Sequence, residues 1–196
     1  MQTYLNKMNG EYVINADHPW FEYRKGNILE TTDIDYLVHQ ANCFHCMGGG
    51  VAFAISRRWP IVAEVDKKTL YGDKSKLGTF SIATVSTQLR IEDEIINKSI
   101  KVVNLYSQFD PGPFITSYEE GERLNAIKTG LINLREYIIN ELIASDIKNK
   151  QAYIGVPWLI GCGISGLKFD NVFEIFKEVF EEYSDTMKIV FVGFNK

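Results

Sequence analysis

The chain has 196 residues, 45% of them hydrophobic and 23% charged, and a formal net charge of -4. These values predict one globular domain with a substantial buried core. The acidic balance argues against a broad phosphate-neutralising surface, so a nucleic acid is not the expected partner. The chain lacks both an apolar run of the roughly 18 residues that span a bilayer and an apolar signal-peptide core. Its three cysteines suit a reducing compartment, so we expect a cytoplasmic protein without membrane contact.

Strands and helices are predicted to alternate along the first half of the chain. Residues 1–20 read as an N-terminal extension or an edge strand, and residues 21–196 as a single domain. The mostly apolar run Asp35–Ala41 is bounded by turn signals, as in a buried strand. The expected elements are, in order, strands at Trp20–Tyr23 and Asp35–Ala41, a helix that begins at Val51 and ends before Pro60, and a helix over Ile61–Tyr71.

The second half continues this alternation. A polar segment, Arg90–Lys98, predicts a long hairpin loop between two strands. Ser117 and Glu120 have capping-box spacing at the start of a long amphipathic helix. The expected elements are strands at Gly78–Val85 and Ser99–Gln108, a helix from Ser117 to Leu142, a strand at Ala152–Ile160, a helix over Val172–Tyr183 and a strand at Lys188–Phe194. This order implies an α/β fold with a sheet that is covered on both faces.

Two glycine-rich turns have the same structural context. The stretch HQANCFHCMGGG, from His39 to Gly50, and the stretch GCGISG, from Gly161 to Gly166, each end a buried strand and lead into a helix. In open α/β sheets, ligands bind beyond the carboxyl ends of the strands. Glycines there allow backbone N–H groups to approach an anion, and the helix N-terminus favours negative charge. Together the two turns indicate a ligand that contains phosphate, such as a diphosphate.

The first turn also contains a Cys-x-x-Cys pair, Cys43 and Cys46. A structural zinc site normally needs four ligands, and the remaining cysteine, Cys162, stands alone. A thioredoxin-like pair normally opens a helix, whereas this pair precedes three glycines. We therefore favour cysteines that serve as small packing residues, and we expect neither a metal nor a cofactor.

Two histidines flank this turn. His45 is either a loop residue without a role or a titrating group. His39 lies near the end of the buried strand, at the mouth of the expected pocket. It is either a hydrogen-bonded core histidine or a general acid or base.

Two longer stretches carry a resemblance to a known family. RKGNILETTDIDYLVHQANCFHCMGGGVAFAI resembles the opening of a macrodomain, and VPWLIGCGISGLKFDNV resembles its second loop. The resemblance covers most of the chain from Lys25 onward. It implies a three-layer α/β/α sandwich with a central mixed sheet, and it implies that the pocket binds ADP-ribose or a derivative.

The resemblance also implies roles for single residues. Asn27 and Ile28 match a "GDI" motif, with Asn27 in place of the acidic residue that contacts adenine; an Asn carbonyl can accept the same hydrogen bond. Asn42 matches the last Asn of "NAAN", which contacts the distal ribose. Phe194 is either an adenine-stacking residue or a core aromatic. The residues that match the two ligand-binding loops are Gly48, Gly49, Gly50 and Val51 in the first, and Gly161, Cys162, Gly163, Ile164, Ser165 and Gly166 in the second.

Within the family, the chain resembles yeast-type ADP-ribose-1″-phosphate phosphatases and stand-alone phage and bacterial macrodomains. This implies a metal-independent hydrolase in which His39 and Asn42 act at the distal ribose. The "GCG" turn is also similar to the terminal ADP-ribose protein glycohydrolase, which uses a lysine and an aspartate. Lys76 either matches that lysine or is a solvated loop residue, and Ser165 stands where the aspartate is expected.

Other activities remain open. The enzyme could instead remove ADP-ribose from protein or from nucleic acid, which would be a partner only as an ADP-ribosylated substrate. The pocket could also belong to a reader that binds ADP-ribose, or a related signalling nucleotide, without turning it over. We expect a monomer.

Overall fold

The strand that leads into the first glycine turn lies in the middle of a six-stranded mixed sheet. The computed structural model describes residues 5–8, 11–14, 18–91, 94–114, 116–145 and 150–193. The sheet has the order β3-β8-β7-β4-β6-β5. Its strands are β3 (Phe21–Lys25), β4 (Tyr36–Asn42), β5 (Phe80–Ile91), β6 (Glu94–Gln108), β7 (Ala152–Pro157) and β8 (Met187–Gly193). Neighbouring strands are parallel except at one edge, where β5 is antiparallel to β6.

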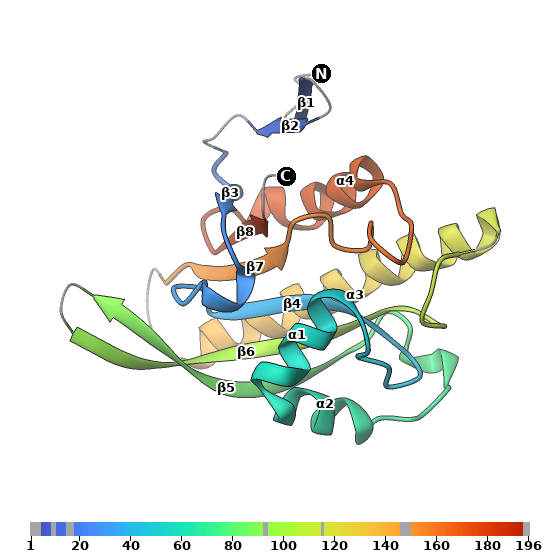
Figure 1. Ribbon diagram of the computed structural model, residues 1–196. Helices are drawn as coiled ribbons and strands as arrows, with labels where there is room; N and C mark the ends of the chain where they lie inside the picture. Colours follow the sequence, from blue (N-terminus) through green and yellow to red (C-terminus); the bar gives the residue numbers. More distant parts are fainter. Residues whose placement is uncertain are drawn as a thin grey trace.

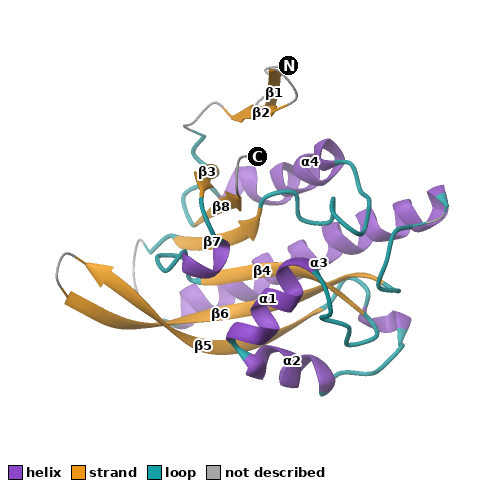
Figure 2. Ribbon diagram, in the orientation of Figure 1, coloured by secondary structure: helices purple, strands orange, loops and turns teal. Residues whose placement is uncertain are grey.

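Helices cover both faces of this sheet. In Figure 1, α1 (Gly50–Arg58) and α2 (Pro60–Lys67) lie in front of the sheet and α3 (Ser117–Ala144) lies behind it. The helix α4 (Phe169–Phe180) packs beside α3, and Figure 2 shows the alternation of helix and strand along the chain. Three short 3₁₀ turns, η1 (Ile28–Glu30), η2 (Lys74–Lys76) and η3 (Glu181–Tyr183), complete the described elements. The predicted three-layer α/β/α sandwich with a mixed sheet is confirmed.

Each face of the sheet has its own apolar core. Aromatic and aliphatic side chains of α3 and α4, such as Leu134 and Phe176, pack on one face. Ile55, Trp59 and Val62 of the first two helices pack on the other. Burial of a large aliphatic or aromatic side chain contributes about 1.5–3 kcal/mol, so these two layers hold the strand ends in fixed positions.

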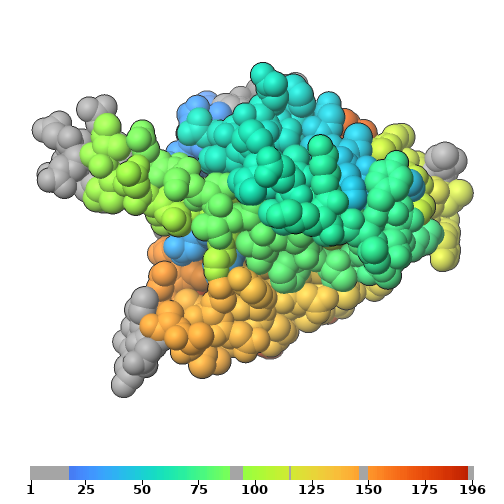
Figure 3. Space-filling view, turned by 90° about the horizontal axis from the view of Figure 1, so that it is seen from below, coloured from blue at the N-terminus to red at the C-terminus, as the bar shows by residue number. Residues whose placement is uncertain are grey.

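The predicted hairpin loop over Arg90–Lys98 is wrong. β5 continues to Ile91 and β6 begins at Glu94, so the two strands stay paired past the edge of β4. Figures 1 and 3 show this two-stranded ribbon projecting from the body of the molecule. Close to the sheet Val85 and Thr87 are still buried, whereas Ile95 and Ile96 in the outer part of the ribbon are exposed. Strands that are exposed need no apolar alternation, so the polar sequence of the outer part conceals them.

Two helix boundaries also differ from the prediction. The capping box of α3 is formed by Thr116 and Glu119, one residue earlier than the predicted pair of Ser117 and Glu120. The second helix ends at Lys67 instead of continuing to Tyr71. Both corrections concern helix ends, where neighbouring polar residues compete for the same backbone groups.

Near the N-terminus, β1 (Leu5–Met8) and β2 (Glu11–Ile14) form a two-stranded antiparallel sheet of their own. The predicted short strand at Trp20–Tyr23 corresponds to β3, which lies at the edge of the main sheet against β8. The division of the chain at residue 20 stays a prediction.

Candidate functional site

A pocket of about 660 Å³ opens at the carboxyl ends of β4, β6 and β7. The loop after β4 and the loop after β7 form two of its walls, and the segment after β6 closes a third side. Most of the residues that the sequence assigned to ligand binding line this pocket. They are His39, Asn42, Gly48, Gly49, Gly50, Val51, Gly161, Cys162, Gly163, Ile164 and Ser165.

Both glycine loops present backbone N–H groups without an acceptor. Gly49 is the N-cap of α1 and makes no side-chain cap, so the first N–H groups of this helix, from Gly50 to Ala52, have no partner within the described chain. In the second loop, the N–H groups of Gly163, Ile164 and Ser165 also donate to no acceptor among the described residues. Clusters of this kind are typical of anion sites.

The two loops meet at the edge of the pocket. A Cβ added to Gly49 would lie 3.2 Å from Cδ1 of Ile164, which is tighter than ordinary van der Waals contact. Gly50 and Gly161 have φ angles of 55° and 75°, a conformation that favours glycine. The glycines therefore allow both the tight turns and the close approach of the two loops.

Asn42 stabilises the first loop from within. Its Oδ1 accepts hydrogen bonds from the backbone N–H groups of Phe44 (2.9 Å) and Cys46 (3.2 Å), and its Nδ2 donates to Cys46 O at 2.7 Å. The register between β4 and β6 shifts at Ala41/Asn42, which directs this side chain toward the loop. The amide of Asn42 therefore fixes the wall of the pocket, while its predicted contact with the distal ribose stays a prediction.

His39 lies on the α1/α2 face of β4 and is only 1% exposed. Its Nε2 lies 2.6 Å from Oδ1 of Asn104, and its Nδ1 lies 3.0 Å from the backbone oxygen of Gln40. Because Nδ2 of Asn104 donates to Val62 O, the amide oxygen faces the histidine and accepts from Nε2–H. Burial lowers the pKa of His39, while the two oxygens that face its ring act in the opposite direction.

The contact between His39 and Asn104 belongs to a longer chain of buried polar groups. Nδ2 of Asn104 also donates to Oγ of Ser81 at 3.0 Å, and that hydroxyl lies 2.8 Å from the hydroxyl of Tyr106. The hydroxyl of Tyr106 donates to Asp66 at 2.8 Å. Burial raises the pKa of Tyr106 to about 12, so it remains a neutral donor.

Lys76 lies at the far end of this chain and is 5% exposed, so its reading as a solvated loop residue is wrong. Its Nζ lies 3.8 Å from Asp66 and 4.2 Å from the centre of the Tyr106 ring, and it donates to the backbone oxygen of Cys43. Burial lowers the pKa of Lys76. The structure places Lys76 behind the first loop and outside the lining of the pocket. Lys76 therefore has no direct access to the pocket, and its catalytic role stays a prediction.

Other predicted residues also lie away from the pocket lining. Asn27 caps η1 by accepting from Leu29 N at 3.1 Å, and Ile28 is buried in the α1/α2 core. Gly166 closes the second loop with a φ of 81° but does not line the cavity. Phe194 lies outside the described residues.

The three cysteines occupy different environments. Cys43 is buried and the pKa of its thiol is raised to about 11 by burial, whereas Cys46 is exposed at the pocket wall. The reading of both as partly buried packing residues is therefore wrong for Cys46. Burial raises the pKa of Cys162 to about 12. Across the described chain, no group of three or more His, Cys, Asp or Glu side chains is arranged to hold a metal ion.

Two side chains of the site, Gln40 and Arg123, were not assigned to it from the sequence, whereas Gln108, near the carboxyl end of its strand, was a candidate for the lining. Gln40 lines the pocket, and so does Gln108, whose buried Oε1 has no hydrogen-bond donor among the described residues. Arg123 lies behind the second loop and is 6% exposed. The burial of Arg123 could have been predicted, because this residue lies four positions before Ile127 and therefore on the buried face of the predicted helix.

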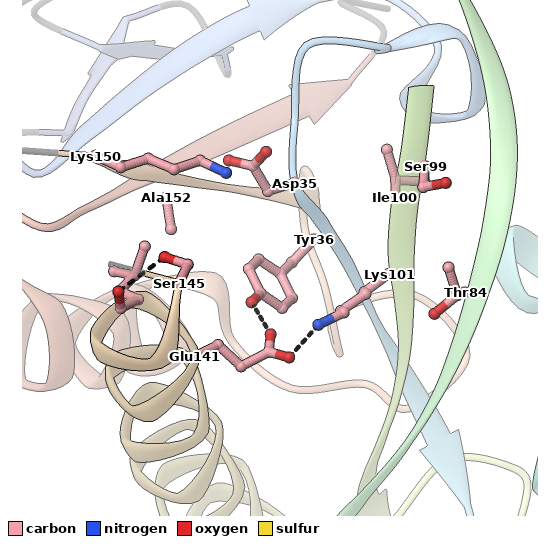
Figure 4. A pocket seen from close by; sticks show the side chains of 11 residues that line it. Asp35, Tyr36, Thr84, Ser99, Ile100, Lys101, Glu141, Ser145, Lys150 and Ala152 are labelled. Atoms are coloured by element: carbon pink, nitrogen blue, oxygen red, sulfur yellow. Dashed lines mark hydrogen bonds and ion pairs between the residues drawn. The ribbon is translucent and has the colours of Figure 1, made fainter. Parts of the chain in front are cut away.

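A second cavity, of about 270 Å³, lies near the amino end of β4 and the carboxyl end of α3. Two of its charged groups, Glu141 and Lys101, are paired with each other. Glu141 accepts from the hydroxyl of Tyr36 and is ion-paired with Lys101, as Figure 4 shows. The hydroxyl of Tyr137 also donates to Glu141, at 2.8 Å. The carboxylate of this cluster is therefore already satisfied by three donors, which indicates a structural role.

Known structures share this fold. The macrodomain of Mycobacterium tuberculosis DarG aligns with a TM-score of 0.57 at 21% identity, over 90% of this chain and 98% of its own. Thermosipho africanus DarTG, solved in complex with ADP-ribose, aligns with a TM-score of 0.59 at 16% identity, over 89% of this chain and 41% of the longer neighbour. The architecture of this chain is thus the macrodomain fold.

A sequence relative extends this result. An uncharacterized 17.5 kDa protein from the tk-vs intergenic region of Enterobacteria phage T4 is 31% identical over 173 residues, which cover 87% of this chain and 94% of that protein. The chain therefore belongs to the same family as this phage protein, and its fold is the macrodomain fold. No family model matches the sequence. No helix of the described chain is long and apolar enough to cross a membrane.

Proposed function

We propose that the pocket binds ADP-ribose or a derivative, with the diphosphate held between the loop after β4 and the loop after β7. The observation that carries this proposal is the pair of unsatisfied N–H clusters, at Gly50–Ala52 and at Gly163–Ser165, on residues that line one cavity. Hydrogen bonds to charged acceptors are about twice as strong as neutral ones, so a diphosphate suits these donors better than a neutral group does. The neighbour DarTG, which is similar in fold, was solved with ADP-ribose.

We further propose that the protein removes the phosphate of ADP-ribose-1″-phosphate. Water adds to phosphorus, the bond between phosphorus and the ribose oxygen breaks, and ADP-ribose and inorganic phosphate leave. One proton of the water must reach the departing ribose oxygen. His39 is the candidate for this transfer; because Nε2–H is bonded to Asn104, the proton would have to pass through Nδ1, which would exchange its contact with the backbone oxygen of Gln40 for the reacting oxygen. General acid–base help of this type is typically worth about 10²–10⁴-fold in rate.

The burial of His39 favours a second candidate function. A histidine that is 1% exposed, with Nε2 held by Asn104, is also what a reader of ADP-ribose would contain as a structural group. A reader binds the ligand and releases no product. Removal of ADP-ribose from protein or nucleic acid is the remaining alternative within the hydrolases.

The test combines binding and turnover. Calorimetry with ADP-ribose measures affinity, and phosphate release from ADP-ribose-1″-phosphate is followed with and without a chelator. His39→Ala is expected to reduce turnover by about 10²–10⁴-fold and to leave ADP-ribose affinity within a few fold. His45→Ala is the matched control, since His45 lies in the first loop but bonds to Thr69 at 3.1 Å.

Each result has a distinct meaning. Phosphate release that resists the chelator and falls only in His39→Ala supports the phosphatase. Binding without release points to the reader or to a hydrolase of ADP-ribosylated protein or nucleic acid. Absence of ADP-ribose binding contradicts the whole proposal.

A further inference from the structure

Arg123 is a buried cation whose immediate neighbours are neutral. It lies in the second turn of α3 and is 6% exposed. Its Nη1 donates to the backbone oxygen of Gly112 at 2.7 Å and to the backbone oxygen of Ser165 at 3.1 Å. The same nitrogen donates to Oγ of Ser165 at 2.8 Å. Both of these loop residues line the pocket.

No carboxylate neutralises this guanidinium through direct contact. Among the described residues, the ion pairs of arginine involve Arg24 and Arg135, and none involves Arg123. The carboxylates of Asp110, Glu119 and Glu122 act on it only at longer range, and burial lowers the pKa of Arg123 despite them. Of these three, Glu119 is bonded in the capping box and Glu122 is ion-paired with Lys74. A buried charge in this situation is normally compensated by a partner of opposite sign.

The hydroxyl of Ser165 connects this charge to the pocket. Ser165 is 3% exposed, and its Oγ accepts from Arg123 and, at 3.4 Å, from Nε2 of Gln40. A hydroxyl has two acceptor positions and one proton to donate. Because both acceptor positions face donors, the proton must point elsewhere, and no acceptor for it occurs among the described residues. The backbone N–H of Ser165 is unpaired in the same part of the structure.

We infer that Arg123 is a positioning residue that acts through Ser165, so that the Ser165 hydroxyl donates its proton to a phosphate oxygen in the pocket. The ligand class is a phosphate or diphosphate ester, and the inference rests on the proposed function for its identification as ADP-ribose. The ligand's negative charge supplies the compensation that Arg123 lacks. The guanidinium polarises the hydroxyl and also ties the segment at Gly112 to the second loop.

The identity of residue 165 follows from the same reasoning. An aspartate at this position would pair with Arg123, neutralise it and place a carboxylate beside the phosphate. A serine leaves the positive charge available to the ligand. Ser165 is therefore suited to anion recognition, in contrast to the aspartate expected in the glycohydrolase branch.

Calorimetry on the full chain tests this assignment with two probes, ADP-ribose and inorganic pyrophosphate. Ser165→Ala and Arg123→Met are each expected to weaken ADP-ribose binding by about 10-fold or more, the range of a hydrogen bond to a charged group. The double variant is expected to lose little more than either single variant, because both changes remove the same donor. Ser165→Asp is expected to weaken binding further than Ser165→Ala, because it adds a like charge.

Arg135→Met is the matched control. Arg135 lies on the same helix, donates to the backbone oxygen of Val179 at 3.2 Å and pairs with Glu136, away from the pocket. Its replacement is expected to lower the free energy of unfolding without changing affinity. Chemical denaturation of each variant separates loss of fold from loss of binding. If Arg123→Met does not fold, Ser165→Ala and Ser165→Asp carry the test.

The outcomes distinguish this inference from the proposed function. If the wild type binds ADP-ribose and both Ser165 variants bind equally well, the inference is overturned and the proposed function stands. Additive losses in the double variant also overturn it, since Arg123 would then act independently of Ser165. If the wild type binds pyrophosphate but not ADP-ribose, and Ser165→Ala abolishes that binding, the inference stands and the proposed function fails.

Discussion

Replacement of Asn104 by leucine is expected to destabilise the protein more than the loss of one buried amide would suggest. Asn104 is fully buried and makes three side-chain hydrogen bonds. Leucine has a similar volume but leaves Nε2–H of His39 without a partner, while the backbone oxygen of Val62 loses one donor and keeps its place within α2. A buried unpaired group costs about 1–3 kcal/mol, to which the loss of the remaining hydrogen bonds of Asn104 adds. That is a substantial part of the roughly 5–15 kcal/mol by which domains are stable.

A double-mutant cycle makes this prediction specific. His39→Leu alone leaves Oδ1 of Asn104 unpaired, whereas His39→Leu with Asn104→Leu removes both partners. The double variant is therefore expected to be more stable than the sum of the single effects predicts, by about 1–3 kcal/mol. Urea denaturation followed by circular dichroism measures each free energy of unfolding, with an unchanged m-value as the sign that the folded state is intact.

Ser81→Ala is the control, because it removes a hydroxyl from the same polar chain without touching His39. It is expected to cost about 1 kcal/mol and to add to the effect of His39→Leu. If the His39 and Asn104 effects add within about 0.5 kcal/mol, the two side chains are not coupled and the reasoning is refuted.

Three further predictions concern single residues. Burial lowers the pKa of His39, so the unfolded chain binds more protons than the folded chain below about pH 6.5, and the free energy of unfolding should fall as the pH drops below that value. His39→Gln should make the free energy of unfolding depend less steeply on pH between pH 7 and pH 5. An equally steep dependence in wild type and variant would contradict the lowered pKa of His39. Thr116→Ala removes the acceptor for the backbone N–H of Glu119 and should cost about 0.5–2 kcal/mol in urea denaturation; a loss below 0.3 kcal/mol would argue against the capping box. The exposed thiol of Cys46 should react with a thiol reagent well before the thiol of Cys43, whose pKa is raised to about 11; mass spectrometry identifies the modified residue, and modification of Cys43 first would reverse the burial assigned here.

Elements with a continuous or a periodic apolar pattern were predictable from the sequence. The strand at Asp35–Ala41 is buried on both faces and appears as a mostly apolar run, and the long helix after Ser117 shows an apolar stripe at helical spacing. The outer part of the ribbon of β5 and β6 was missed because its apolar side chains Ile95 and Ile96 are exposed, so burial imposes no pattern on the sequence there. Its strands are held by backbone pairing, which any sequence can make.

The walls of the pocket were predictable and its supports were not. Glycines in the two loops were visible in the sequence because larger residues are disfavoured there, by the close contact with Ile164 at Gly49 and by the positive φ angle at Gly161. The contact between Arg123 and Ser165 joins residues 42 positions apart, and that between His39 and Asn104 joins residues 65 apart. A single sequence contains no signal for such pairs before the fold brings them together.

The polar row across the sheet also limits how the strands can align while the protein folds. His39 is paired in register with Asn104, and Asn104 with Ser81, so the three side chains lie side by side on neighbouring strands. A slip of β6 by two residues would keep every apolar side chain on its proper face, and burial alone would scarcely oppose it. It would, however, set the Asn104 amide opposite Leu37 or Ala41 and leave it unpaired. The row therefore selects one alignment among several that a purely apolar sheet would tolerate, at a penalty of about 1–3 kcal/mol for each group misplaced.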